Sequence, residues 1–92
     1  MNKQEEYPGW ANYETWNVAL WITSDHGLYE TAKTCKNLPD AYGAFLAIIT
    51  ELAEVPTTFF AYKGMAYQTP DGVAWNDSGL NEDELNECIN NL

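Results

Sequence analysis

The sequence predicts a mainly α-helical protein, a small three- to four-helix domain with a short irregular or β-hairpin insert. Apolar residues recur at i, i+3, i+4 and i+7 in two separate segments, which is typical of amphipathic helices. Asparagine or aspartate, the residues preferred at helix N-termini, precede the expected helices. The 92 residues are 46% hydrophobic, which suits a single domain, 1–92, with one core.

The first helix is expected over residues 13–23, with Asn12 as its N-cap. Glu14 falls in the first turn, where a negative charge interacts favourably with the helix dipole. Apolar side chains occupy nearly the whole circumference, interrupted only by Glu14, Thr15 and Asn17. A helix that is apolar on nearly all sides is usually buried, so we expect this segment to be the central helix.

The second helix is expected to be short and to cover residues 28–35. Ser24 and Asp25 supply its cap, and Gly27 marks the corner between it and the first helix. The side chains expected to face inward are Leu28, Tyr29 and Ala32.

Two later segments carry the clearest helical periodicity. One begins at Pro39 or Asp40 and runs to about residue 54, and the other follows Asn81. Glu84 lies three residues after Asn81, which is the spacing of a capping box. The apolar positions with i, i+3, i+4, i+7 spacing are Phe45, Ile48, Ile49 and Leu52 in the first segment and Leu85, Cys88, Ile89 and Leu92 in the second.

The insert is expected between these two helices, over residues 57–79. Its first part fits either a small β-hairpin or a short helix at 57–62, and the sequence does not decide between them. Residues 69–72, Thr-Pro-Asp-Gly, form a strong turn signal. We expect Trp75 to return to the core after this turn, and we also assign Trp16, Trp21 and Phe45 to the core.

The charge is unusually one-sided. The sequence contains fourteen acidic side chains, four lysines and no arginine, for a formal net charge of -10. Such a surface repels nucleic acid and anionic membranes and attracts basic surfaces, of which the commonest in a cell are built to hold DNA or RNA. Without arginine there is no bidentate phosphate clamp, so direct nucleic-acid binding is disfavoured and no membrane partner is expected.

Most of the excess charge lies in the C-terminal half, residues 51–92. If the third and last helices are neighbours, its carboxylates could follow one another at about the 5.4 Å rise of a helical turn, near the phosphate spacing of a nucleic-acid strand. The candidate partner-binding residues are these carboxylates and two aromatic anchors: Glu51, Glu54, Asp71, Asp77, Glu82, Asp83, Glu84, Glu87, Trp10 and Phe59. A simpler interpretation needs no partner, because acids in the first turn of the last helix are stabilised by the helix dipole.

No combination of residues indicates catalysis. His26 is the only histidine and has no second ligand at metal-binding spacing, so we expect neither a metal nor a cofactor. Cys35 and Cys88 fall on apolar helix faces, where buried structural cysteines are common. No glycine-rich phosphate loop is present. We therefore expect that the protein is not an enzyme.

The same sequence gives an expectation for the compartment. The N-terminal segment has no apolar stretch of the kind found in secretory signals. No apolar run approaches the roughly 20 residues needed to cross a bilayer. Two cysteines are too few for a disulfide scaffold. We expect a cytoplasmic protein with reduced thiols.

Two motifs carry a resemblance to a known family. Residues 9–22, GWANYETWNVALWI, and residues 69–77, TPDGVAWND, followed by Leu80 and Leu85, resemble a family of small proteins of bacteriophages, other mobile elements and some bacteria. The family has no established activity, so no functional residue is carried over. The resemblance implies a mobile-element setting, in which small acidic proteins are often inhibitors of host defence, including anti-CRISPR and anti-restriction proteins.

The leading hypothesis is therefore a small acidic inhibitor that acts in the cytoplasm of a bacterial host. It would bind the basic surface of a host nucleic-acid-binding protein or complex as a nucleic-acid mimic. The alternative is a protein–protein adaptor or a homo-oligomeric assembly module that uses an aromatic surface. A third interpretation is that the acidic composition serves only solubility, in which case neither kind of partner is required.

Overall fold

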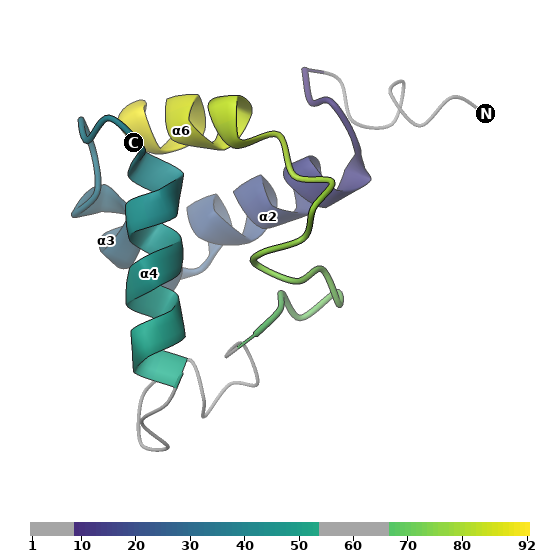
Figure 1. Cartoon of the computed structure of the whole chain (residues 1–92), viewed down its shortest axis with the longest axis horizontal. Coiled ribbons are helices and arrows are strands. Elements are labelled where there is room, and N and C mark those ends of the chain that lie inside the picture. Colours follow the sequence, from purple (N-terminus) through teal and green to yellow (C-terminus); the bar gives the residue numbers. More distant parts are fainter. Residues whose placement is uncertain (1–8, 54–66) are drawn as a thin grey trace.

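The computed structural model describes residues 9–53 and 67–92 of the chain. It confirms the mainly α-helical fold class (Figure 1). The expected hairpin or helix at 57–62, as well as Glu54 and Phe59, lies outside the described residues. The helices of the described segments are α2 (Tyr13–Ser24), α3 (His26–Lys33), α4 (Ala41–Ala53) and α6 (Glu82–Asn90).

Helix α2 has the predicted position, but its burial differs from the prediction. Asn12 caps it, and its side-chain oxygen accepts a hydrogen bond from Thr15 N at 2.9 Å. Thr15 and Asn17 are fully buried, whereas Leu20 is 37% exposed. The prediction of a helix buried on all sides is wrong, because its inward face carries two hydrogen-bonded polar side chains and apolar Leu20 faces outward.

Helix α3 begins and ends two residues earlier than predicted. Asp25 is its N-cap, and Asp25 Oδ1 accepts a hydrogen bond from Leu28 N at 3.1 Å. The helix therefore starts directly after Asp25, and Gly27 lies within its first turn rather than at a corner. Leu28 and Ala32 are buried as expected, and Cys35 is buried although it follows the helix.

Helices α4 and α6 are neighbours, as the charge hypothesis required. Asp40 begins α4 by accepting a hydrogen bond from Gly43 N at 3.1 Å. The next amide, Tyr42 N, donates to Asn86 Oδ1 of α6 at 2.7 Å. Helix α6 thus lies across the N-terminal end of α4, and the C-terminal end of α4 leads away from it (Figure 1).

The capping box predicted for α6 forms only in part. Asn81 Oδ1 accepts from Glu84 N at 3.0 Å, as predicted. The Glu84 carboxylate does not return to Asn81 N, which donates instead to Thr15 Oγ1 of α2 at 2.9 Å. Glu84 Oε1 accepts from Ala11 N at 2.8 Å. The start of α6 is therefore joined to Ala11 and to Thr15 on α2.

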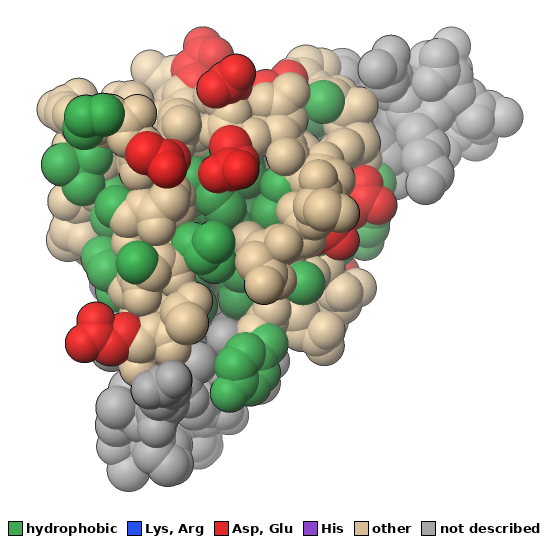
Figure 2. Space-filling view, in the orientation of Figure 1, with side chains coloured by type: hydrophobic (Ala, Val, Ile, Leu, Met, Phe, Trp, Pro, Cys, Tyr) green, Lys and Arg blue, Asp and Glu red, His purple; other side chains and the backbone are tan. Residues whose placement is uncertain are grey.

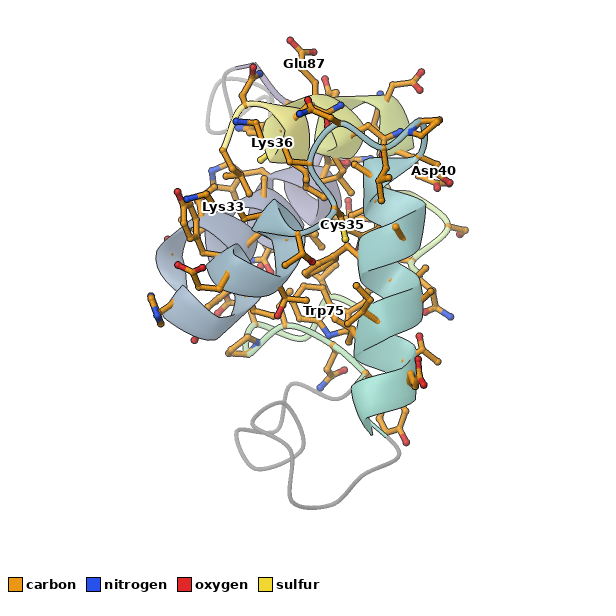
Figure 3. All side chains as sticks on the ribbon, turned by 90° about the vertical axis from the view of Figure 1, so that its left-hand side faces the viewer. Lys33, Cys35, Lys36, Asp40, Trp75 and Glu87 are labelled. Carbon is orange, nitrogen blue, oxygen red and sulfur yellow. The ribbon has the colours of Figure 1, made fainter. Side chains whose placement is uncertain are left out.

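The core lies between the helices and is closed by the segment after the turn. Trp75 is 2% exposed, which confirms that it returns to the core. Its side chain lies between α3 and α4 in Figure 3. Its ring meets Phe45 edge-on, with ring centroids 6.1 Å apart. Trp16 and Trp21 are only half-buried, so their assignment to the core was too strong. The buried apolar side chains are Val18, Ala19, Ile22, Leu28, Ala32, Cys35, Ala41, Tyr42, Phe45, Ile49, Val73, Trp75, Leu85 and Ile89.

The predicted turn at residues 69–72 is present. Gly72 N donates to Thr69 O at 2.9 Å, and Gly72 has φ +95°, a left-handed conformation that glycine adopts without strain. One isolated antiparallel bridge joins Gln68 and Ala74, and the described part of the insert contains no longer ladder. The turn is therefore a compact irregular loop within the described residues.

Candidate functional site

A partly buried hydrogen-bond network joins the two sequence motifs. Asn17 on α2 is fully buried, and its Nδ2 donates to Asp71 Oδ2 at 2.8 Å. Asn17 Oδ1 accepts from Thr69 Oγ1 at 2.7 Å. Trp21 Nε1 donates to the same Asp71 oxygen at 2.9 Å. These motif residues therefore hold the 69–72 turn against α2.

Asp71 was predicted to be a partner-binding carboxylate, but one of its oxygens is used inside the protein. Hydrogen bonds from Asn17 first, and from Trp21 second, lower the pKa of the Asp71 carboxyl below its usual value. The carboxylate is exposed and ionised at neutral pH, and its immediate role is to orient the turn.

Two further candidates also accept internal hydrogen bonds. Asp77 Oδ1 accepts from Gly79 N at 2.7 Å, which closes a short side-chain turn before α6. Glu84 Oε1 accepts from Ala11 N, as described above. Three of the predicted candidates, Asp71, Asp77 and Glu84, therefore have a structural explanation that needs no partner.

Four predicted carboxylates remain unengaged within the described segments: Glu51, Glu82, Asp83 and Glu87. Each is exposed, and none accepts a hydrogen bond or forms an ion pair with another described residue. Glu82, Asp83 and Glu87 all lie on α6. Glu51 follows Tyr42 by nine residues on α4, or about 14 Å along the helix axis. Because α4 leads away from α6, Glu51 stands apart and the described carboxylates do not form one continuous track.

Lys33 and Lys36 are the lysines within the described segments, and neither forms an ion pair with an α6 carboxylate. The face in Figure 2 displays acidic side chains and no lysine among the described residues. Lys33 and Lys36 lie on the side seen in Figure 3, where Glu87 projects outward from α6. Lys33 Nζ stands 5.6 Å from the ring centroid of Tyr29, and Lys36 Nζ donates to the backbone oxygen of Leu92 at 2.7 Å. The charges of Glu82, Asp83 and Glu87 are thus not neutralised by these lysines.

The residues considered for chemistry are not assembled into a reactive group. His26 is exposed at the start of α3. Among the described residues, no three histidine, cysteine or acidic side chains are grouped in a way that could hold a metal ion. Cys35 and Cys88 are both free thiols. Burial raises the pKa of the Cys88 thiol, which lowers its thiolate fraction and hence its nucleophilicity.

Tyr42 was not singled out from the sequence, although it is a buried titratable group. Its hydroxyl donates to Trp75 O at 2.6 Å. Burial, and then the negative charge of Glu82, raises the pKa of the Tyr42 phenol far above its usual value. Tyr42 therefore stays protonated and holds the segment after the turn against α4. The only sequence signal was a polar aromatic residue at the start of an apolar helix.

Of the two predicted aromatic anchors, Trp10 lies within the described residues and Phe59 does not. Trp10 is half-buried and lines an open hollow of about 240 Å³ between the chain before α2 and the outer side of α6. Its neighbours in this hollow include Glu84, Glu87 and Cys88. The structure thus brings one predicted aromatic residue together with two predicted carboxylates.

These features define a small helical protein with an acidic, exposed last helix and an adjoining hollow that Trp10 lines. The chain belongs to a family of unknown function, DUF7249, whose model matches residues 3–92. No curated protein and no solved structure gives a significant match to the chain. None of the helices in the described segments is long and apolar enough to cross a membrane.

Proposed function

We propose that this protein binds a basic surface of a nucleic-acid-handling protein or complex and occupies it in place of DNA or RNA. The observation that carries the proposal is the exposed group Glu82, Asp83 and Glu87 on α6, which has no ion-pair partner among residues 9–53 and 67–92, in a chain of net charge -10. For a phage-type chain, the target would be a defence complex of the bacterial host, which makes the protein an anti-CRISPR or anti-restriction inhibitor.

Electrostatics supports this proposal. Carboxylates held on one short helix repel each other, and that repulsion opposes the folded state. A basic partner surface relieves the repulsion and gains favourable Coulomb energy. Asp83 and Glu87 are four residues apart, so they lie about one helical turn, or roughly 6 Å, from each other along the axis. The two carboxylates therefore follow one another along the axis of α6, as phosphates follow one another along a nucleic-acid strand.

The test compares two double variants that remove the same charge. Asp83→Asn with Glu87→Gln removes two of the four negative charges of α6, and Glu30→Gln with Glu51→Gln removes two from exposed positions on α3 and α4. Exposed ion pairs contribute up to about 1 kcal/mol each, so the α6 variant should bind its partner up to about 25-fold more weakly. The control variant should lose much less. Equal weakening by both variants would show that net charge, and not α6, determines binding.

A second candidate function is an adaptor or homo-oligomeric module. It is favoured by a hollow of about 170 Å³ beside the partly exposed face of α2, lined by Trp10, Trp16, Ala19, Leu20 and Thr23. Binding through this face should persist at high salt, because apolar contacts are not screened. Leu20→Ser should abolish such binding, and the α6 double variant should leave it intact. Analytical ultracentrifugation of both variants distinguishes the two functions if the partner is a second copy.

A further inference from the structure

We propose that the hollow beside Trp10 receives an arginine side chain of the partner protein. The inference rests on the proposed function and deepens it, because it names the group that the acidic surface recognises. The residues that line this Trp10 hollow are Gly9, Trp10, Glu84, Glu87, Cys88 and Asn91, around a volume of about 240 Å³.

The hollow is built by contacts between distant parts of the chain. Gly9 has φ +89° and turns the chain ahead of Trp10. Ala11 N then donates to Glu84 Oε1 at 2.8 Å, and Asn12 Nδ2 donates to Gly79 O at 2.6 Å. These two hydrogen bonds attach Ala11 and Asn12 to the start of α6 and to the residues just before it. They thereby hold the Trp10 ring beside that helix. The site is therefore formed before any partner binds.

The lining chemistry selects a cation. Glu87 accepts no hydrogen bond within the described segments, and Glu84 has one oxygen that is not engaged there. An indole ring attracts a cation over its face, and arginine is the side chain that most often occupies such a position. A guanidinium can stack on the ring and donate to carboxylates with its remaining N–H groups. An anion would be repelled by both glutamates.

The remaining groups agree with this assignment. Cys88 contributes a largely protonated thiol, because burial raises its pKa, so it adds no third negative charge. Lys36 lies near the C-terminal end of α6, where its ammonium donates to the backbone oxygen of Leu92. The described residues lack a group of three metal ligands, which argues against a bound metal ion as the occupant. A large, planar cation suits the ring and the two carboxylates better than a small ion.

The experiment uses acetyl-triarginine amide as the probe and the full chain labelled with nitrogen-15. Peptide is titrated in about 0.1 M salt while the indole N–H of Trp10 and the backbone N–H of Cys88 are followed by NMR. Both signals should move and saturate together. Glu87→Gln should weaken binding about fivefold, whereas Glu51→Gln, which removes the same charge from α4, should weaken it less than twofold. Trp10→Leu should weaken binding at least as much as Glu87→Gln, and Trp10→Phe should retain part of it.

The outcomes separate this inference from the proposed function. If Glu87→Gln and Glu51→Gln weaken peptide binding equally, the hollow is not a site, although the acidic surface can still bind a basic partner. If acetyl-trilysine amide binds as tightly as the arginine peptide, the assignment to arginine is overturned. If the arginine peptide binds as described but no nucleic-acid-handling partner is displaced by duplex DNA, the hollow stands and the proposed function fails.

Discussion

Replacement of Thr69 by valine should destabilise the protein more than any surface substitution of similar size. The Thr69 hydroxyl donates to Asn17 Oδ1 at 2.7 Å and accepts from Val73 N at 3.1 Å. Both bonds are buried, and Thr69 is 1% exposed. Valine has nearly the same shape, so the change removes the two hydrogen bonds without opening a cavity.

The magnitude follows from the groups left without partners. An unsatisfied buried polar group costs about 1–3 kcal/mol, and Thr69→Val creates two of them. Asn17 keeps its bond to Asp71, so we expect a total near the lower part of the sum, about 2–4 kcal/mol. A domain of this size is stabilised by about 5–14 kcal/mol, so the loss is a large part of the total.

Urea unfolding followed by far-ultraviolet circular dichroism and by tryptophan fluorescence measures this loss. Thr23→Val is the matched control. Thr23 is exposed on α2, the helix that carries Asn17, and its hydroxyl donates only to backbone carbonyls of that helix. The control should stay within about 0.5 kcal/mol of the wild type. If Thr69→Val also stays within that range, the network does not hold the turn to α2 and the reasoning is refuted.

Three further predictions concern titratable groups. Tyr42→Phe should lower the free energy of unfolding by about 1–2 kcal/mol at neutral pH, as measured by calorimetry. Because the folded pKa of Tyr42 is raised, its stabilising contribution is lost as pH rises above the ordinary value of about 10. The stabilities of the wild type and the variant should therefore converge above that pH. The folded pKa of Asp71 is lowered, so its contribution is present above the ordinary value of about 3.9 and is lost as pH falls through the lowered value. The advantage of the wild type over Asp71→Asn should therefore shrink in acid, and urea unfolding at a series of pH values measures it. Iodoacetamide at neutral pH should modify Cys88 faster than Cys35, and it should modify both more slowly than the thiol of glutathione. Mass spectrometry measures the rates, and a fast reaction at Cys35 would contradict its burial.

The local signals in the sequence predict the helices because capping and periodicity act over a few residues. Asn12, Asp40 and Asn81 cap their helices as predicted, because each bonds an amide within three residues. The inward position of Asn17 could not be predicted in this way. Its partners Thr69 and Asp71 lie 52 and 54 residues away, so its burial depends on a tertiary contact that no local pattern reports.

The same distinction applies to the candidate site. Glu82, Asp83 and Glu87 were identified from charge alone, and the structure leaves them exposed. The internal use of Glu84 was missed because its partner, Ala11 N, is 73 residues away. The separation of Glu51 was also missed, because the sequence predicts that α4 and α6 are helices but not that they cross at one end. Spacing along the chain therefore identified the charges and not their arrangement.

The most direct test of the central claim is a pull-down with the tagged protein from nuclease-treated bacterial lysate. It is performed at about 0.1 M and about 0.5 M salt, with and without added duplex DNA, and compared with the Asp83→Asn, Glu87→Gln variant. We predict that a nucleic-acid-binding complex is recovered at low salt, displaced by the duplex and lost with the variant. Recovery of a partner that is unaffected by salt, duplex and variant would contradict the account.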